Sequence, residues 1–345
     1  MSNEQEKTLN QSVTAPFSPF ETTPITEIYE DEHYSTIRQG SITNTLTKIT
    51  GKEAEIDAYT GDATFKRGNV NMSITRYEQL AGLRTTAMQL LDALTIGLTE
   101  SGARSPKVTM PLSVYMEQRG LKDRKEAKKQ IVADMEILKN VSISGTERKG
   151  GKIQSYGFMN LADSGTVSPN GEITFTFGQT FFENVLLQNT VMPYPKQLLK
   201  VNSKKNPCSY YFGRKIDEHY NMNYGKPNAT TIAVSTLLEN APLPSYDEVM
   251  AGNKHLTERI IRPFERDLDA LSDTLKWEYR TPQGNALTAE EKAALDYYSF
   301  VGLNVRFKLL NYPTHTQEAK LERKTERINN TKQSKKTASK KKEAQ

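Results

Sequence analysis

Cysteine and histidine are scarce in this chain of 345 residues. Cys208 is the single cysteine, which excludes a disulfide framework and a cysteine-rich zinc site. The four histidines lie far apart in the sequence, and no two of them have the spacing of metal ligands. We therefore expect a protein of the reducing cytoplasm that needs neither a metal nor another cofactor.

Long hydrophobic runs are also missing. No uncharged apolar stretch approaches the roughly 18–20 residues that a membrane helix needs. The polar and acidic residues 1–10 lack the basic and apolar regions of a secretory signal. The chain has no phosphate-binding loop of the form G-x-x-x-x-G-K-[ST], which argues against an ATPase. We expect a protein that is not an enzyme and has no membrane partner.

Charge is distributed unevenly around the net value of +5. Residues 320–345 contain ten basic residues against three acidic ones, whereas residues 1–40 contain seven acidic residues against two basic ones. These compositions predict a disordered acidic arm over residues 1–40 and a basic tail over residues 320–345. Because the basic total comes mainly from the tail, a role in nucleic-acid binding must be argued from where charges lie in the body.

Two segments between these ends, residues 41–190 and 191–319, show the same order of expected elements. That order is a helix, a strand, two helices, a strand, a turn and a closing strand. For the first segment we expect a helix over 80–98, a strand over 107–110, helices Leu112–Arg119 and Arg124–Lys139 with Asp123 as N-cap, a hairpin of 141–144 and 153–161, and a strand over 173–177. For the second we expect a helix over 206–220, a strand over 232–234, helices over 235–240 and 257–275, a strand over 277–280, a short helix capped by Thr288 and a strand over 301–309. The fold class is therefore α+β, and the repeated order predicts two tandem winged-helix domains.

Two of these helices combine an apolar stripe with a basic face. The stripes are Ala127, Ile131, Met135 and Leu138 in the helix 124–139, and Ile260, Phe264, Leu268, Leu271 and Leu275 in the helix 257–275. The basic residues on or beside these helices are Arg124, Lys125, Lys128, Lys129, Lys254, Arg259, Arg262 and Arg266. Each helix follows a shorter helix and precedes a hairpin, which is the position of the major-groove helix in a winged-helix domain. Arginine suits bidentate contact with guanine and lysine suits phosphate, and Lys149 and Lys152 in the first hairpin turn would lie like a wing.

The alternative is that these basic rows are only solvated helix faces. Glu126, Glu258 and Glu265 are spaced to form ion pairs with them. The occurrence of two such helices at matching positions favours DNA binding. Pro263 removes a backbone hydrogen bond from the second helix, so it should bend that helix or mark a second helical segment.

Three segments together resemble the iteron-type plasmid replication initiators, a family with two winged-helix domains. The segments are Glu172–Phe177 with Thr180-Phe181-Phe182, residues 198–211 (LLKVNSKKNPCSYY) with Asp217-Glu218, and residues 257–268 (TERIIRPFERDL) leading to Trp277-Glu278-Tyr279. The shared pattern is a strand that ends the first domain, a Lys/Ser segment before an aromatic helix, and a helix with I-x-x-P near its start. It covers residues 74–312, and the N-terminal arm and the proline-rich loop 241–246 depart from it.

The resemblance implies a protein that binds repeated origin sites on double-stranded DNA. Host initiator proteins would help to open the duplex and load the replicative helicase, and homodimers formed through the first domain would repress the protein's own promoter. Transferred residue by residue, Lys204 and Lys205 would contact phosphates at a helix N-terminus. The resemblance places Arg259, Arg262 and Arg266 in the major groove, and Lys125, Lys128 and Lys129 on the DNA face of the first domain.

Two other functions remain open. A transcriptional repressor of its own promoter could use the same fold, although two winged halves in one chain favour an initiator. A metal-dependent nickase or relaxase would need a histidine pair near a nucleophilic tyrosine. The tyrosine pairs Tyr210-Tyr211 and Tyr297-Tyr298 have no such histidines beside them, which favours aromatic packing as their role.

Overall fold

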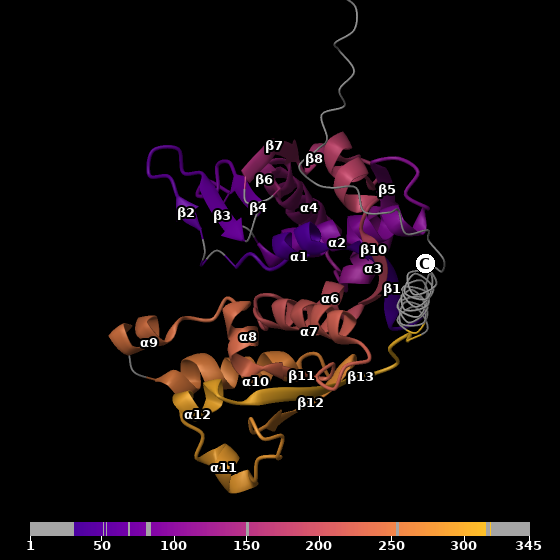
Figure 1. Ribbon diagram of the computed structural model, residues 1–345. Helices are drawn as coiled ribbons and strands as arrows, with labels where there is room; N and C mark the ends of the chain where they lie inside the picture. Colours follow the sequence, from indigo (N-terminus) through magenta and orange to yellow (C-terminus); the bar gives the residue numbers. More distant parts are fainter. Residues whose placement is uncertain are drawn as a thin grey trace, which may run out of the picture. The chain divides into compact units, whose positions relative to one another are not determined.

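The computed structural model describes residues 31–50, 52, 54–67, 70–80, 84–149, 152–252, 255–314 and 318 (Figure 1). Residues 67, 70, 145–149 and 152–156 are described by their backbone alone. The chain is a mixed α+β protein that divides into two compact units. Among the described residues, the first unit comprises 37–191, and the second comprises 31–36, 192–314 and 318. No helix in the described part of the chain is both long enough and apolar enough to cross a membrane.

β1 (Tyr34–Gln39) pairs with β10 (Thr190–Pro195), and the division between the units falls within both strands. All six residues of β1 are buried. The prediction of a disordered arm up to residue 40 is therefore wrong for residues 34–39. The Arg38 guanidinium donates to the Leu187 carbonyl at 3.1 Å, which holds the strand within its unit. The rest of the predicted arm, residues 1–30, and the tail from residue 319 lie outside the described residues.

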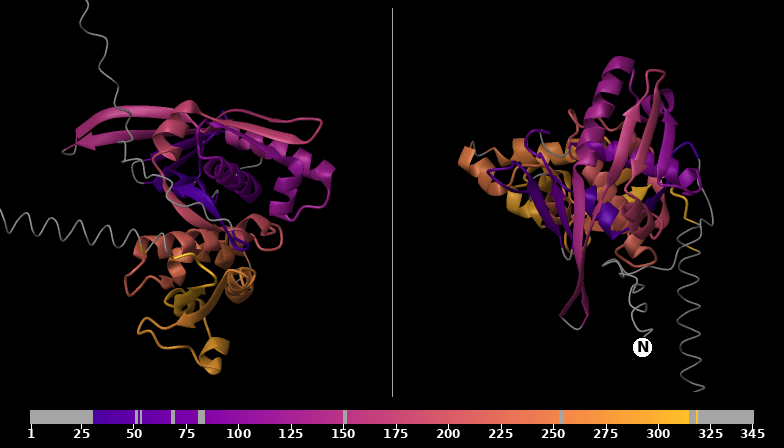
Figure 2. Two further views of the ribbon diagram at one scale, coloured as in Figure 1. Left: turned by 90° about the vertical axis from the view of Figure 1, so that its right-hand side faces the viewer. Right: turned by 90° about the horizontal axis from the view of Figure 1, so that it is seen from above.

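A five-stranded antiparallel sheet in the first unit has the order β2-β3-β4-β6-β7. Its strands are β2 (Glu55–Ile56), β3 (Ala63–Arg67), β4 (Val70–Ile74), β6 (Val141–Lys149) and β7 (Lys152–Asn160), and α1 (Ser41–Leu46) precedes them. The long β6–β7 hairpin projects from the unit (Figure 2). The first element predicted in this segment was the helix over 80–98, so α1, β2, β3 and β4 were not predicted, because no strong periodicity marks these short elements.

A second sheet in the same unit has the order β5-β9-β8 and packs with three helices. Its strands are β5 (Lys107–Pro111), β8 (Ala162–Val167) and β9 (Glu172–Phe177), and the helices are α2 (Thr85–Glu100), α3 (Leu112–Arg119) and α4 (Arg124–Lys139). A short segment, α5 (Gln179–Phe181) and η1 (Phe182–Leu186), ends the unit. Because β6 pairs with β4, the hairpin β6–β7 that was predicted as a wing belongs to the five-stranded sheet and not to the sheet β5-β9-β8. The turn that closes the β5-β9-β8 sheet is residues 168–171, between β8 and β9.

Local capping signals define α3 and α4, and both helices have the predicted bounds. The Asp123 carboxylate accepts from the amides of Lys125 and Glu126, which confirms it as the N-cap of α4. Such a cap contributes about 1 kcal/mol. Gly120 ends α3 with φ of 64°, a left-handed conformation that favours glycine. The predicted stripe of α4 is buried, and α4 packs against α2 and β8.

The second unit contains a three-stranded sheet of order β11-β13-β12 with helices beside it (Figure 1). The strands are β11 (Thr231–Ala233), β12 (Leu275–Arg280) and β13 (Asn304–Leu309). The helices are α6 (Gln197–Lys200), α7 (Ser209–Asn223), α8 (Val234–Glu239), α9 (Tyr246–Gly252), η2 (Thr257–Ile261), α10 (Arg262–Asp269), α11 (Ala289–Ala293) and α12 (Tyr297–Val301). Phe264 of α10 lies at the centre of its core, against Phe212, Tyr279 and Phe300.

The structure differs from the helix predicted over residues 257–275 both before and after Pro263. η2 is a π-helical turn, and an α-helix starts at Arg262 with Pro263 in its first turn, which confirms the second segment. The helix ends at Asp269 rather than Leu275. The Ala270 carbonyl accepts from the Gln197 side chain at 2.9 Å instead of from a following helical amide. Leu271 is still buried, but in a turn.

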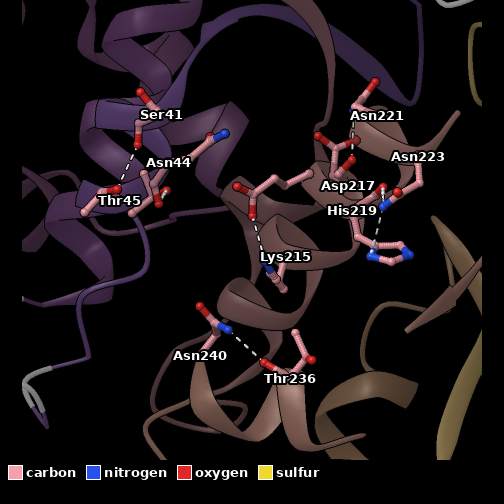
Figure 3. A network of polar contacts seen from close by, with 12 residues as sticks. Ser41, Asn44, Thr45, Lys215, Asp217, His219, Asn221, Asn223, Thr236 and Asn240 are labelled. Carbon is pink, nitrogen blue, oxygen red and sulfur yellow. Dashed lines mark hydrogen bonds and ion pairs between the residues drawn. The ribbon is translucent and has the colours of Figure 1, made fainter. Parts of the chain in front are cut away.

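Polar side chains bind backbone carbonyls along the last turns of α7 (Figure 3). The Asn221 amide donates to the Asp217 carbonyl at 2.8 Å, and the Asn223 amide donates to the His219 carbonyl at 2.9 Å. The Asp217 carboxyl itself is buried, and burial raises its pKa to about 7 although Arg214 opposes the shift. Outside this helix, the Tyr34 hydroxyl donates to the Leu310 carbonyl at 2.9 Å, so the first residue of β1 packs within the second unit.

Candidate nucleic-acid interface

In the first unit, two predicted basic residues at the start of α4 bind the turn between β8 and β9. Arg124 Nη2 donates to the Asn170 carbonyl at 3.0 Å, and Lys128 Nζ donates to the Pro169 carbonyl at 2.8 Å. Gly171 has φ of 88°, and a Cβ there would collide with the Arg124 guanidinium. Its carbonyl accepts from the Leu112 amide at 2.7 Å. The helix and the turn therefore form one continuous cationic edge.

Lys125 and Lys129 lie exposed on α4 beside this edge. Within the described residues neither lysine forms an ion pair, and Glu126 does not pair with either of them. Their side chains are available to phosphates. The alternative that Glu126 neutralises this face has no support in the contacts of α4.

Three predicted basic residues have side chains outside the described part of the chain. Lys149 and Lys152 end β6 and begin β7, and only their backbone is described. Lys254 precedes η2 and is not described at all. The other nine predicted residues have described side chains.

α4 carries a buried carboxyl, Asp134, on its packed face. Asp134 accepts from the Thr86 hydroxyl of α2 at 2.8 Å, while its Oδ2 has no partner in the described structure. Burial raises the pKa of Asp134 to about 6, although the Thr86 hydroxyl and the Arg119 guanidinium favour the charged form. The packing of α4 therefore depends on a group that titrates near neutral pH.

In the second unit, η2 and α10 hold three predicted arginines in three different environments. Arg259 is exposed and forms no ion pair within the described residues. Arg262 pairs with Glu258 one turn earlier at 2.7 Å, and its side chain remains 67% exposed. An exposed pair of this kind contributes little and can exchange for a phosphate. Arg266 is held more firmly, because its Nε and Nη2 both donate to Asp267 Oδ1 at 2.7 Å.

Asp267 joins α10 to the start of α7. Its side chain is fully buried, and its Oδ2 accepts from the Cys208 amide at 2.6 Å. The Ser209 hydroxyl donates to the Asp267 carbonyl at 2.7 Å. Asp267 was not predicted from the sequence. Its position beside Leu268, at the edge of the apolar stripe, was the one sign that this acidic side chain could be buried.

Lys204 and Lys205 lie exposed in the turn before α7. Both of their backbone amides donate to Asn202 Oδ1, at 3.0 and 3.2 Å, which fixes the turn. α7 begins at Ser209, so the prediction of a start at residues 206–207 is wrong by two residues. The Cys208 amide at this helix terminus already donates to Asp267 Oδ2, so this amide is not open to an external anion.

Comparisons with known proteins give limited information. No protein-family model matches the sequence, and no curated protein sequence matches it. A crystal structure of domains 2 and 3 of RctB, a replication initiator of Vibrio, superposes with a TM-score of 0.37 and 12% identity over 86% of this chain and 99% of that chain. A second structure of RctB domains 2 and 3 gives a TM-score of 0.34 and 10% identity over 82% of this chain and 94% of that chain. At these TM-scores the likeness assigns neither a fold nor a function to this chain.

Proposed function

We propose that the protein is a sequence-specific double-stranded DNA-binding protein that initiates replication of a plasmid or mobile element at repeated origin sites. Two winged-helix domains would bind the DNA, without a catalytic step. The host initiator and the replicative helicase would be recruited in the cytoplasm, and the first unit would form homodimers.

One observation carries the proposal. In each unit a helix, a strand, a second helix and a cationic helix are followed by two further strands, and the three strands form a sheet with the last strand in its centre. β6 and β7 are inserted after α4 in the first unit, and α11 and α12 lie between the last two strands in the second. The sheet orders β5-β9-β8 and β11-β13-β12 are equivalent in this respect. A cationic helix before such a hairpin is the arrangement by which a winged-helix domain enters the major groove.

The described side chains support separate roles in DNA contact. Arg259 and Arg262 are exposed on η2 and α10 and suit base edges. Lys125, Lys129 and the turn of Lys204 and Lys205 suit phosphates, which position the protein without reading sequence.

Footprinting on the DNA that encodes the protein and on its flanks tests the proposal. We expect protection over direct repeats, at spacings that place successive sites along the duplex. Protection confined to a short inverted repeat at the promoter would instead support the second candidate, a transcriptional repressor. An absence of any protected site would contradict both.

The outside alternative, a metal-dependent nickase or relaxase, is tested separately. Supercoiled plasmid is incubated with the protein and a divalent metal ion, and its topology is followed on a gel. We expect unchanged topology, and nicking that depends on the metal would overturn the proposal of binding without catalysis.

A further inference from the structure

The sheet of the second unit has one face covered by helices and one exposed face. On the covered face, Tyr279 of β12 stacks with Phe264 of α10, with 6.5 Å between the ring centroids. Phe307 of β13 faces His219 of α7, with 6.3 Å between their ring centroids. Side chains alternate between the faces of a strand. The intervening residues of β12 and β13 therefore lie on the other face, away from α7 and α10.

That other face is strongly basic. Lys276 lies directly opposite Lys308 in the antiparallel register, and Arg306 follows two residues from Lys308 along β13. All three side chains are exposed. Like charges directly opposite in a sheet are destabilising, so this arrangement does not serve the stability of the unit.

The outward positions of these two strands hold one acidic residue, Glu278, which lies opposite Arg306 in the register. Glu278 forms an ion pair with Arg280. Lys276, Arg306 and Lys308 form no ion pair within the described part of the chain. The three cations line a depression of about 200 Å³ on the two strands, together with Glu278, Trp277 and Phe307.

The composition of the face indicates its ligand. No large exposed hydrophobic side chain of the described residues lies on β11, β12 or β13. Trp277 and Phe307 line the depression but are half-buried and buried, so they offer no open ring face for single-stranded bases and no apolar side chain to insert into a membrane. A phosphate backbone is the remaining polyanion that three closely spaced cations suit.

We propose that Lys276, Arg306 and Lys308 form a second DNA-binding surface, which contacts the phosphates of a duplex on the side of the sheet opposite α10. This inference rests on the proposed function and extends it. The second unit thereby binds DNA backbone on a face that is separate from the base-reading arginines Arg259 and Arg262. Because phosphate contacts are independent of sequence, the surface raises affinity for all duplexes equally.

The test compares two double variants of the full chain. Lys276→Gln with Lys308→Gln removes two charges from the proposed surface, and Lys66→Gln with Lys107→Gln removes two exposed strand lysines of the first unit. The affinity for a short duplex of random sequence is measured over a range of salt concentrations. We expect the slope of log K against log salt to fall in magnitude by about 2 for the first variant and to be unchanged for the second.

Thermal unfolding of both variants shows whether the fold is intact. We expect the Lys276/Lys308 variant to be at least as stable as the parent, because the opposed like charges are removed. An unchanged salt slope in a folded variant overturns this inference, while failure of the parent to bind any duplex overturns the proposed function. Loss of binding to vesicles of anionic phospholipid, with an unchanged DNA slope, would assign the surface to a membrane instead and also overturn the inference.

Discussion

The cationic helices of the two units are anchored in different ways. α4 uses two of its own basic residues, Arg124 and Lys128, to hold the turn that follows in the sheet. α10 uses a buried acid, Asp267, to hold the start of α7. The first arrangement places helix and turn together in one cationic edge. The second leaves Arg259 and Arg262 exposed, with Arg262 paired only with the exposed Glu258, and under the proposed function these two arginines would read bases.

The two helices also differ in the environment of their buried carboxyl. Asp134 of α4 accepts one hydrogen bond, from a hydroxyl, and no cation of the described residues lies within hydrogen-bond distance of it. Burial raises its pKa to about 6. Asp267 in α10 is bound by an amide and by the Arg266 guanidinium. A satisfied carboxylate can fix one geometry, whereas an incompletely satisfied one makes the packing sensitive to pH.

The largest expected effect breaks the anchor of α10. Asp267→Ala removes the acceptor of the buried Cys208 amide, so the free energy of unfolding of the second unit should fall by about 2–4 kcal/mol. Trp277 is the only tryptophan and lies in β12 of this unit, so its fluorescence during denaturation reports the loss. The matched control Glu258→Ala removes an exposed carboxylate and should cost less than about 1 kcal/mol. Equal losses in the two variants would contradict the role given to Asp267.

The next largest effect concerns Asp134, the buried acid of α4. The pKa of Asp134 is raised from an unfolded value of 3.8 to about 6, so the native state binds the proton more tightly. The contribution of Asp134 to the stability of the first unit should therefore be present in full below about pH 4 and be lost, by up to about 3 kcal/mol, as the pH rises through 6. Asp134→Asn should remove this decline. Denaturation of both proteins at several pH values measures it, and a parallel decline in the variant would show that another group is responsible.

The arginines of the second unit should separate base reading from anchoring. Arg259→Ala or Arg262→Ala should lower discrimination between the footprinted site and random duplex by about 1–3 kcal/mol. Arg266→Ala should instead act mainly on the stability of the unit, since its guanidinium binds Asp267. Competition binding with both DNAs measures the difference. An equal loss on both DNAs for Arg259 would make it a phosphate contact.

The smallest effect is expected for the lysines of α4. Lys125→Gln with Lys129→Gln should weaken binding to all duplexes alike and reduce the salt slope by about 2, while discrimination is retained. The exposed Lys122 and Lys139 lie outside this face at the two ends of α4, and their substitution by Gln provides the control. A change of discrimination by the Lys125/Lys129 variant would contradict the contrast between the two helices.

The sequence predicted the features that local residues determine. Asp123 marks the start of α4 and Gly120 marks the end of α3, and both were predictable because a cap acts within a single turn. The apolar stripe of α4 was predictable from the spacing of its residues. The partner of β6 could not be predicted, because β4 lies far away in the sequence and only tertiary pairing brings it there. For the same reason the sequence could not show that β6 and β7 lie in a different sheet from β5, β8 and β9.

The candidate site was predictable to a similar extent. The basic residues of α4, η2 and α10 followed from helical spacing, but the pairing of Arg266 depends on the burial of its neighbour Asp267. Alternation in β13 placed Arg306 and Lys308 outward, yet the opposition of Lys308 to Lys276 is a matter of register between strands. Such register is fixed by packing rather than by either strand alone.

Site-specific photo-cross-linking tests the central claim most directly. A photoreactive side chain is placed at position 129 of α4 or position 259 of η2, with position 66 of β3 as the control, in the full chain bound to its footprinted duplex. We predict cross-links to DNA from positions 129 and 259 and none from position 66. Saturated binding without a cross-link from either helix would contradict the claim that both units present a cationic helix to the duplex.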